Sequence, residues 1–367
     1  MAETTKIEWA DSTLNVWEGC QETASPACVG CYARERNLRY APKGTKEAPN
    51  WGPHAQRREV KSWRATLRKI SRRAAWAFAF GRTEPWFVFV NSLSDFWDNQ
   101  ADPKLRAEAL AEFRKHPHLT FLLLTKRPQN IVKLFRQTLH ELDGSFVDDG
   151  AVPISDYWPR NVAIGCTVVT QAEADRDVPW LLAAKAALNP AFAFLSMEPP
   201  VEVVDLTRLA YRFNGAEFPA ANPVKTLNAL TGRVTSLDPV FAVNDNDHLP
   251  ALDWIITGGG TDQGKHKAYP TPIAAFRKVR DDCAAAGVPY LLKQWGEWTP
   301  GENVRRKRGR VPVAWWFNDQ WQYGEENLAD TDGHVDDEPD LYRVGKKAAG
   351  RMLDGRTHDD RPKVRHG

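Results

Sequence analysis

Short apolar runs alternate with amphipathic segments along most of the chain. Runs that end in polar residues are followed by segments in which apolar residues recur at helical spacing. The predicted strands lie within residues 12–20, 86–97, 119–128, 161–170, 191–200, 252–261 and 288–298, and the main predicted helices lie within residues 102–117, 129–142, 171–188 and 271–287. Continuous apolar strands separated by helices are typical of a parallel sheet that is buried on both faces. This α/β pattern predicts a full or partial TIM-type parallel (β/α) barrel, with an open doubly wound sheet as the alternative.

Two stretches break the rhythm of strands and helices. Residues 203–250 are rich in proline and asparagine, and we interpret them as an insertion in a barrel that spans residues 1–298. Residues 299–367 form an irregular C-terminal extension that we expect to pack on the barrel. This extension contains a basic run at 305–310, an aromatic, hairpin-like segment at 313–324 and an acidic patch at 330–340. We expect the two charged runs to pair with each other and remain solvated.

Composition and charge restrict the class of protein. Hydrophobic residues make up 42% and charged residues 26% of the 367 positions, as in a folded globular protein. The formal net charge of +2 gives no overall attraction to nucleic acid or anionic membranes. The N-terminus has no apolar signal region, and the chain has no run of eighteen apolar residues. We therefore expect a cytoplasmic protein without a membrane span, in which cysteines stay reduced.

Polar residues follow nearly every predicted strand. Because the carboxyl ends of parallel strands meet at one edge of a sheet, these residues should converge where such folds place their chemistry. They are Asn91, Ser92, Ser94 and Asp95; Thr125, Lys126 and Arg127; Thr167 and Thr170; Ser196 and Glu198; Gly258, Gly259 and Gly260; and Lys293 and Gln294.

Three of the five cysteines fall within twelve positions after the first predicted strand. They are Cys20, Cys28 and Cys31. Three thiolates can bind three irons of a [4Fe–4S] cluster and leave the fourth iron open to a ligand, and S-adenosylmethionine is a cofactor that chelates such an iron. The other two, Cys166 and Cys283, lie in an apolar strand and on a helix face, where we expect buried thiols.

Zinc is the alternative occupant of the cysteine cluster. A closed site would need a fourth ligand, for which His54 and His118 are candidates, but the chain has no second pair of closely spaced ligands. The corresponding function is a zinc-stabilised, non-catalytic protein that binds nucleic acid. Its surface would combine residues 305–310, Lys346, Lys347 and the neighbouring tryptophans.

Several segments together resemble a known family. They are KIEWADSTLNVWEGC and SPACVGCYARE near the N-terminus, the strand ends FVNSLSDFW, LLLTKRP and FLSMEPP, and then LDWIITGGGTDQG, AGVPYLLKQWGEW and RVGKKAAGRMLDGRTHDDRP. In this order they are similar to the phage three-Cys-motif protein family. The resemblance implies a barrel like that of radical S-adenosylmethionine enzymes, with three cysteines after the first strand and no settled substrate.

The sequence departs from the usual pattern of radical enzymes in three places. The cysteine spacing is C-x7-C-x2-C instead of C-x3-C-x2-C, and the aromatic residue, Tyr32, follows Cys31 instead of preceding it. Gly258, Gly259 and Gly260 stand where relatives tend to carry Gly-Gly-Glu. Any role of that carboxylate is therefore absent or relocated here.

Roles can be assigned to the strand-end residues by chemistry. We expect Ser92, Ser94 and Asp95 to bind the ammonium and carboxylate groups of S-adenosylmethionine. Thr167 and Glu198 would contact the ribose, and the glycines at 258–260 would let the backbone approach the adenine. Lys126, Arg127 and Lys293 would bind an anionic substrate or neutralise the cluster and cofactor. The structural alternatives are that Asp95 caps the helix beginning near Asp102 or a short turn before it, that Lys126 and Arg127 are solvated, and that Glu198 is exposed.

The predicted function follows from these roles. We expect a radical S-adenosylmethionine enzyme that generates a 5′-deoxyadenosyl radical, with an electron donor as its partner. The phage resemblance suggests a nucleotide or DNA as the substrate.

Overall fold

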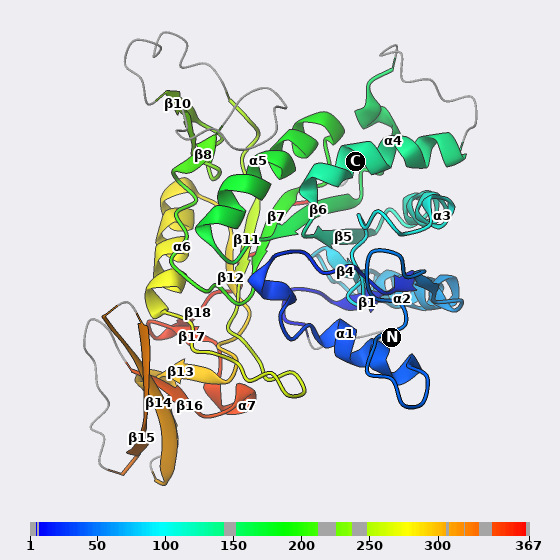
Figure 1. The fold of residues 1–367 in the computed structure, drawn as a ribbon. Helices are drawn as coiled ribbons and strands as arrows, with labels where there is room; N and C mark the ends of the chain where they lie inside the picture. The colour runs from blue at the N-terminus through cyan, green and yellow to red at the C-terminus, as the bar shows by residue number, and fades with distance from the viewer. Residues whose placement is uncertain are drawn as a thin grey trace.

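The computed structural model describes residue 5 and residues 7–142, 152–211, 225–236, 248–305, 308–318, 320–329 and 340–364 (Figure 1). The expected pairing of the basic run with the acidic patch lies largely outside this range, because residues 306–307 and 330–339 are not described. No helix in the described part is long and apolar enough to span a membrane.

Seven parallel strands form the central sheet. They are β1 (Ser12–Leu14), β4 (Trp86–Val90), β5 (Leu119–Thr125), β6 (Val162–Thr167), β7 (Ala193–Met197), β11 (Trp254–Thr257) and β12 (Tyr290–Leu292), and they are adjacent in this order. Every predicted strand is therefore present, and the predicted parallel sheet is confirmed. In the described sheet β1 and β12 are edge strands, so the sheet is a half-barrel.

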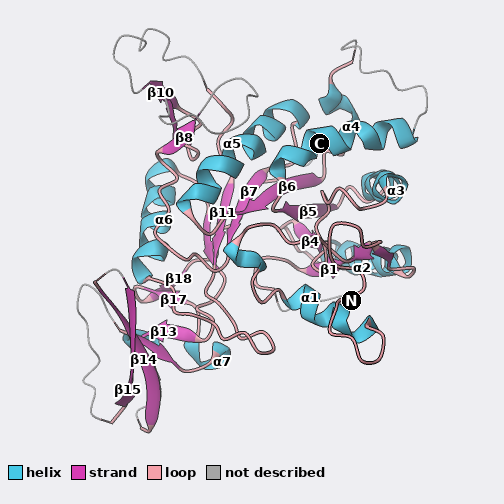
Figure 2. Cartoon of the chain, in the orientation of Figure 1, coloured by secondary structure: helices cyan, strands magenta, loops and turns pink. Residues whose placement is uncertain are grey.

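Helices cover the outside of this sheet (Figure 2). They are α2 (Trp63–Ala79), α3 (Pro103–Arg114), α4 (Ile131–Leu142), α5 (Gln171–Leu188) and α6 (Ile273–Ala286). Local signals explain their ends. Asp102 caps α3 by accepting from the Lys104 amide at 2.9 Å, with Pro103 in the first helical position. Gly287 ends α6 in the left-handed conformation.

The strands are apolar throughout because both of their faces are buried. In β4, Val88 and Val90 belong to the large core between the sheet and the helices. Phe87 and Phe89 point to the other face, where they join an aromatic cluster that includes Trp9, Phe192, Phe194 and Trp254. The Trp9 and Phe89 ring centroids are 4.6 Å apart. These rings fill part of the half-barrel, so an open cavity has to lie elsewhere in it.

The predicted insertion contains a small antiparallel sheet. Its strands are β8 (Leu209–Tyr211), β9 (Lys225–Leu227) and β10 (Val234–Ser236). Figure 1 shows this sheet near the top of the view, far from the strands that follow β12.

The C-terminal extension contains a second antiparallel sheet. It consists of β13 (Trp298–Pro300), β16 (Leu341–Arg343), β14 (Arg310–Phe317) and β15 (Gln320–Asn327), in this spatial order. The predicted hairpin is confirmed, since Trp316 pairs with Trp321 in the β14–β15 ladder. The short pairs are β2 (Trp17–Glu18) with β3 (Arg58–Glu59), and β17 (Met352–Leu353) with β18 (Arg356–Thr357). The short helices are α1 (Tyr32–Asn37), α7 (Lys346–Ala349), η1 (Pro26–Cys28), η2 (Leu38–Tyr40), η3 (Pro128–Asn130), η4 (Ile154–Tyr157) and η6 (Gly301–Asn303).

Candidate active site at the carboxyl edge of the sheet

A cavity of about 770 Å³ opens at the carboxyl ends of the parallel strands. This volume is in the range of pockets that hold drug-sized ligands, roughly 300–1,000 Å³. The cavity brings together the predicted site residues apart from Gly258 and from Thr170, which caps α5. Those that line it include Cys20, Cys28, Cys31, Ser92, Ser94, Asp95, Lys126, Arg127, Thr167, Glu198, Gly259, Gly260 and Lys293. Residues far apart in the sequence thus meet as the parallel topology requires.

The three cysteines lie on the loop between β2 and α1. Ser25 begins the short helix η1 by accepting from the Ala27 amide at 3.2 Å, and this helix ends at Cys28. Gly30 has a φ of +67°, which favours glycine, and the chain then enters α1 after Cys31. The Tyr32 hydroxyl donates to the Ser92 carbonyl, so the aromatic residue after the last cysteine joins the loop to the end of β4.

The thiols suit a thiolate-ligated group by their chemistry and position. All three are free and partly buried, and they line the same cavity. Within the described residues, however, no three His, Cys, Asp or Glu side chains form a preformed metal-binding group. Binding of a metal or cluster would therefore require the cysteine loop to draw its thiols together.

The two histidines considered for a zinc site do not lie at this cavity. His118 immediately precedes β5, at the opposite end of the strand, and its Nε2 lies 3.0 Å from Ser71 Oγ on α2. His54 is exposed and is not part of the cavity wall. The histidine that does line the cavity is His266, and a Cβ atom added to Gly30 would lie 2.9 Å from its Cβ.

Asp95 is a buried acceptor for four donors. Its oxygens accept from the Thr125 hydroxyl at 2.7 Å, from Arg127 Nη1 at 2.8 Å and from the backbone amides of Trp97 and Lys126 at 2.9 and 3.1 Å. Asp95 does not cap α3, whose cap is Asp102, but its bond to the Trp97 amide closes a short turn before that helix, as the second form of the structural alternative predicted. Because both carboxylate oxygens already have two donors inside the protein, Asp95 is placed to orient Arg127.

Arg127 connects this carboxylate to the cysteine loop. Its Nη1 lies 3.9 Å from the sulfur of Cys20, and its Nη2 donates to the Gln21 carbonyl. The expectation that Arg127 is solvated is wrong, since its side chain is 8% exposed. Burial lowers the pKa of Arg127, but the charge of Asp95 and its hydrogen bond to Arg127 outweigh burial and raise the pKa above its usual value. Arg127 therefore places a permanent positive charge beside Cys20, a candidate metal ligand.

Cys20 is protonated at neutral pH in this environment. Burial, with a contribution from the Asp95 charge, raises the pKa of its thiol to about 12, and Arg127 opposes the rise. A metal binds the thiolate, so binding here has to displace a proton.

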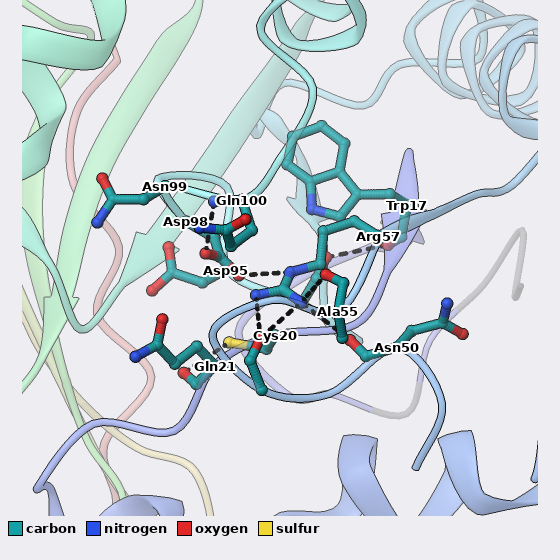
Figure 3. A network of polar contacts seen from close by, with 12 residues as sticks. Trp17, Cys20, Gln21, Asn50, Ala55, Arg57, Asp95, Asp98, Asn99 and Gln100 are labelled. Atoms are coloured by element: carbon teal, nitrogen blue, oxygen red, sulfur yellow. Dashed lines mark hydrogen bonds and ion pairs between the residues drawn. The ribbon is translucent and has the colours of Figure 1, made fainter.

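A second buried arginine holds the loop that packs behind Cys20 (Figure 3). Arg57 Nε donates to Asp98 at 2.8 Å, and its Nη atoms donate to the backbone carbonyls of Asn50, Gly52 and Ala55 at 2.5–3.2 Å. The Gly52 amide in turn donates to the Cys20 carbonyl at 2.9 Å. Arg57 thereby fixes the backbone next to the first cysteine.

Glu198 and Lys293 form an ion pair on the other side of the cavity. One oxygen of Glu198 accepts from the Trp9 indole and from the Ser196 hydroxyl, both at 3.2 Å, and the other accepts from Lys293 Nζ. The alternative that Glu198 is exposed is wrong, because its side chain is only 14% exposed. The ammonium group of Lys293 is therefore already paired with a carboxylate inside the protein.

The two predicted serine hydroxyls also have partners within the protein. Ser92 Oγ lies 3.2 Å from Asn15 Nδ2, and Ser94 Oγ donates to the Trp17 carbonyl at 2.9 Å. Thr167 and Ser196 are paired in register at the ends of β6 and β7. A serine oxygen that already donates can still accept, so these hydroxyls remain available to a ligand's donors.

Two buried amides at the cavity have an unused polar atom. Asn91 Oδ1 accepts from the Val16 amide at 2.8 Å, and Gln294 Nε2 donates to the Gly259 carbonyl at 2.9 Å. Asn91 Nδ2 and Gln294 Oε1 have no hydrogen-bond partner within the described chain. Both residues line the cavity. A buried polar atom without a partner is costly, so these two atoms are natural contacts for a bound molecule.

The glycines after β11 are explained in part by packing within the protein. A Cβ atom on Gly259 would lie 1.8 Å from the carbonyl oxygen of Trp295, so only glycine fits there. Gly258 lies outside the cavity wall, and a Cβ on Gly260 would make ordinary contacts with Ala268 and Pro199. The predicted approach of the backbone to an adenine is thus not needed to explain Gly259.

Sequence reasoning did not place several residues of the cavity wall at the site. Arg36 comes from α1, His266 and Lys267 from the segment after β11, and Lys346 from α7. None lies directly at the end of a parallel strand, so the strand-end rule could not find them. Lys346 was named only as part of the alternative nucleic-acid surface of the C-terminal extension.

Comparisons with known proteins give a family but no activity. No curated protein and no solved structure matches the chain. A family model described as "Protein of unknown function (DUF5131)" matches residues 4–362. The chain therefore belongs to this family of unknown function, DUF5131.

Proposed function

We propose that the protein is a radical S-adenosylmethionine enzyme whose Cys20, Cys28 and Cys31 hold a [4Fe–4S] cluster. The observation that carries the proposal is the shared cavity: three free thiols and the polar ends of six parallel strands line one space at the carboxyl edge of the sheet. Three thiolates leave one iron open. A purely structural metal site would not need polar side chains from so many strands.

The cluster would supply the electron that cleaves the sulfonium bond of S-adenosylmethionine and yields the 5′-deoxyadenosyl radical. The chain's own contribution is to bind and orient the cofactor. Ser92, Ser94 and Thr167 offer hydroxyl oxygens, and Asn91 Nδ2 and Gln294 Oε1 offer an unused donor and acceptor. Glu198 can accept from the ribose hydroxyls while remaining paired with Lys293.

Arg127 and Asp95 have revised roles in this proposal. Asp95 positions Arg127, and Arg127 places its charge near Cys20. A positive charge beside a thiolate ligand partly neutralises an anionic cluster and raises its reduction potential. We therefore propose these two as positioning residues and not as direct contacts of the cofactor's ammonium group.

The test is to incubate the anaerobically purified, reduced protein with S-adenosylmethionine and to measure 5′-deoxyadenosine by chromatography. We expect its formation in the intact protein and its loss in Cys28→Ala. Cys283→Ala is the matched control, because Cys283 is buried in α6 away from the cavity. Absence of 5′-deoxyadenosine from protein that carries a full complement of iron would refute the proposal.

A further inference from the structure

The cavity wall carries six lysine and arginine side chains, and three of them are already used inside the protein. Arg127 pairs with Asp95 at 2.8 Å, Lys267 pairs with Asp262 at 2.8 Å, and Lys293 pairs with Glu198. Asp262 also accepts from Arg343 Nη2, at 2.8 and 2.7 Å. None of the three cations is free to neutralise a substrate without breaking an existing pair.

The other three cations are Arg36, Lys126 and Lys346. Across the described ranges none of their side chains has a hydrogen bond or ion pair. The carboxylates of the cavity wall do not neutralise these three cations. Asp95 pairs with Arg127, Glu198 pairs with Lys293, and Glu22 pairs with Arg34 at 3.3 Å. The described wall thus has a surplus of three positive charges.

These three cations come from separate parts of the chain. Arg36 lies on α1 after the cysteine loop, Lys126 follows β5, and Lys346 begins α7 in the C-terminal extension. Arg36 and Lys346 are exposed, whereas Lys126 is half-buried. Positive charge therefore continues from the mouth of the cavity toward its interior.

We infer that this cavity binds a phosphate-bearing substrate through Arg36, Lys126 and Lys346. Several negative charges spread along a chain of phosphates match several cations at different depths better than one carboxylate does. Tyr32 and Tyr269 also line the cavity and are 45% and 36% exposed, so they offer aromatic faces on which a base can stack. The ligand class is accordingly a nucleotide, either as a free nucleoside triphosphate or within a single strand.

This inference shares one assumption with the proposed function, namely that this cavity is the active site. Its test therefore uses the full-length chain without added iron or S-adenosylmethionine, so that a failure of the radical chemistry does not affect the result. The probe is a fluorescein-labelled single-stranded DNA of twelve nucleotides, followed by fluorescence anisotropy. Unlabelled dATP, the same DNA and inorganic pyrophosphate serve as competitors.

We expect Arg36→Gln, Lys126→Gln and Lys346→Gln each to weaken binding by about 5- to 20-fold, as for the loss of one charged hydrogen bond. Lys347→Gln is the matched control, since Lys347 is the exposed neighbour on α7 that does not line the cavity, and we expect less than a twofold change. Displacement by both dATP and DNA would identify the nucleotide unit as the shared ligand. If the labelled DNA does not bind, dATP binding is measured directly, and binding of dATP alone would identify the free nucleotide as the source.

Three results would overturn the inference. One is the absence of binding of either nucleotide probe at millimolar concentration. Another is equal binding by the three variants and the Lys347→Gln control. The third is loss of binding only on replacing Arg305, Arg308 and Arg310, which would assign nucleotide binding to the basic run of the C-terminal extension and not to the cavity.

Discussion

Two buried arginine–aspartate pairs flank the cysteine loop, and they differ in what else the arginine contacts. The Arg57–Asp98 and Arg127–Asp95 pairs both have an N···O distance of 2.8 Å. The remaining N–H groups of Arg57 donate to backbone carbonyls of residues 50–55. Arg127 instead lies beside the Cys20 sulfur and lines the cavity. The same chemical pair thus stabilises the architecture in one place and shapes the site in the other.

Breaking the Arg57–Asp98 pair should have the largest effect on stability. In Arg57→Met the Asp98 carboxylate, whose side chain is fully buried, loses its ion-pair partner. We expect the free energy of unfolding to fall by about 3–5 kcal/mol, as measured when one partner of a buried pair is removed. Urea denaturation followed by tryptophan fluorescence measures this change.

Arg58→Ala is the matched control for that experiment. Arg58 is 36% exposed, and its partner Glu18 keeps Arg39 at 3.2 Å. Because the buried Glu18 keeps a second arginine, no buried carboxylate is left without a cation, and the control should lose less stability than Arg57→Met. Equal destabilisation by the two substitutions would contradict the architectural role of Arg57.

Breaking the Arg127–Asp95 pair should reduce stability less than breaking the Arg57–Asp98 pair does, but it should weaken metal binding more. In Arg127→Met, Asp95 still accepts from Thr125 and from two backbone amides. We expect a loss of about 1–3 kcal/mol, typical of a buried acceptor that loses one charged partner. Iron retained after anaerobic reconstitution and gel filtration should fall well below that of the parent protein. Full retention of iron would exclude the proposed role of Arg127 beside Cys20.

His116 lies at the opposite end of the parallel sheet from the cavity and carries a third prediction. Burial lowers the pKa of His116, whose Nδ1 lies 2.9 Å from Ser71 Oγ. The unfolded chain therefore binds a proton at higher pH than the folded chain does, and stability should fall as pH decreases through the unfolded value of 6.5. Unfolding midpoints at pH 7.5 and 5.5 measure this slope.

His116→Gln should reduce that pH dependence, leaving the share that comes from His358, whose pKa burial also lowers. An unchanged slope in His116→Gln would show that this histidine does not contribute. We expect this effect to be the smallest of the three, because His116 is only partly buried and Glu112, 3.8 Å from its Nε2, opposes the effect of burial.

The parallel sheet could be predicted from sequence because its strands are apolar on both faces. Runs such as residues 119–125 have only one explanation in a chain of alternating strands and helices, and they place Lys126 and Arg127 at the strand end. Closure of the barrel could not be predicted, since it depends on strand tilt and stagger, which no local pattern encodes.

Site residues could be predicted only where they come directly after a predicted strand. The cysteines and strand ends were found by position and residue type, but their partners were not. Nothing in the segment that holds Asp95 and Asp98 tells which aspartate will face Arg127 and which will face Arg57, because both arginines arrive from distant loops. Arg36 was missed for the same reason, and Lys346 was predicted only as part of a separate nucleic-acid surface and not of this cavity.

The most direct measurement is the metal content of the anaerobically reconstituted protein, with its visible spectrum. We expect about four irons and matching sulfide per chain with broad absorbance near 400 nm, as for thiolate-ligated clusters. This content should be lost in Cys20→Ala, Cys28→Ala and Cys31→Ala and kept in Cys283→Ala. One zinc per colourless chain, or full iron content after removal of any one of the three loop cysteines, would contradict the proposed cluster site.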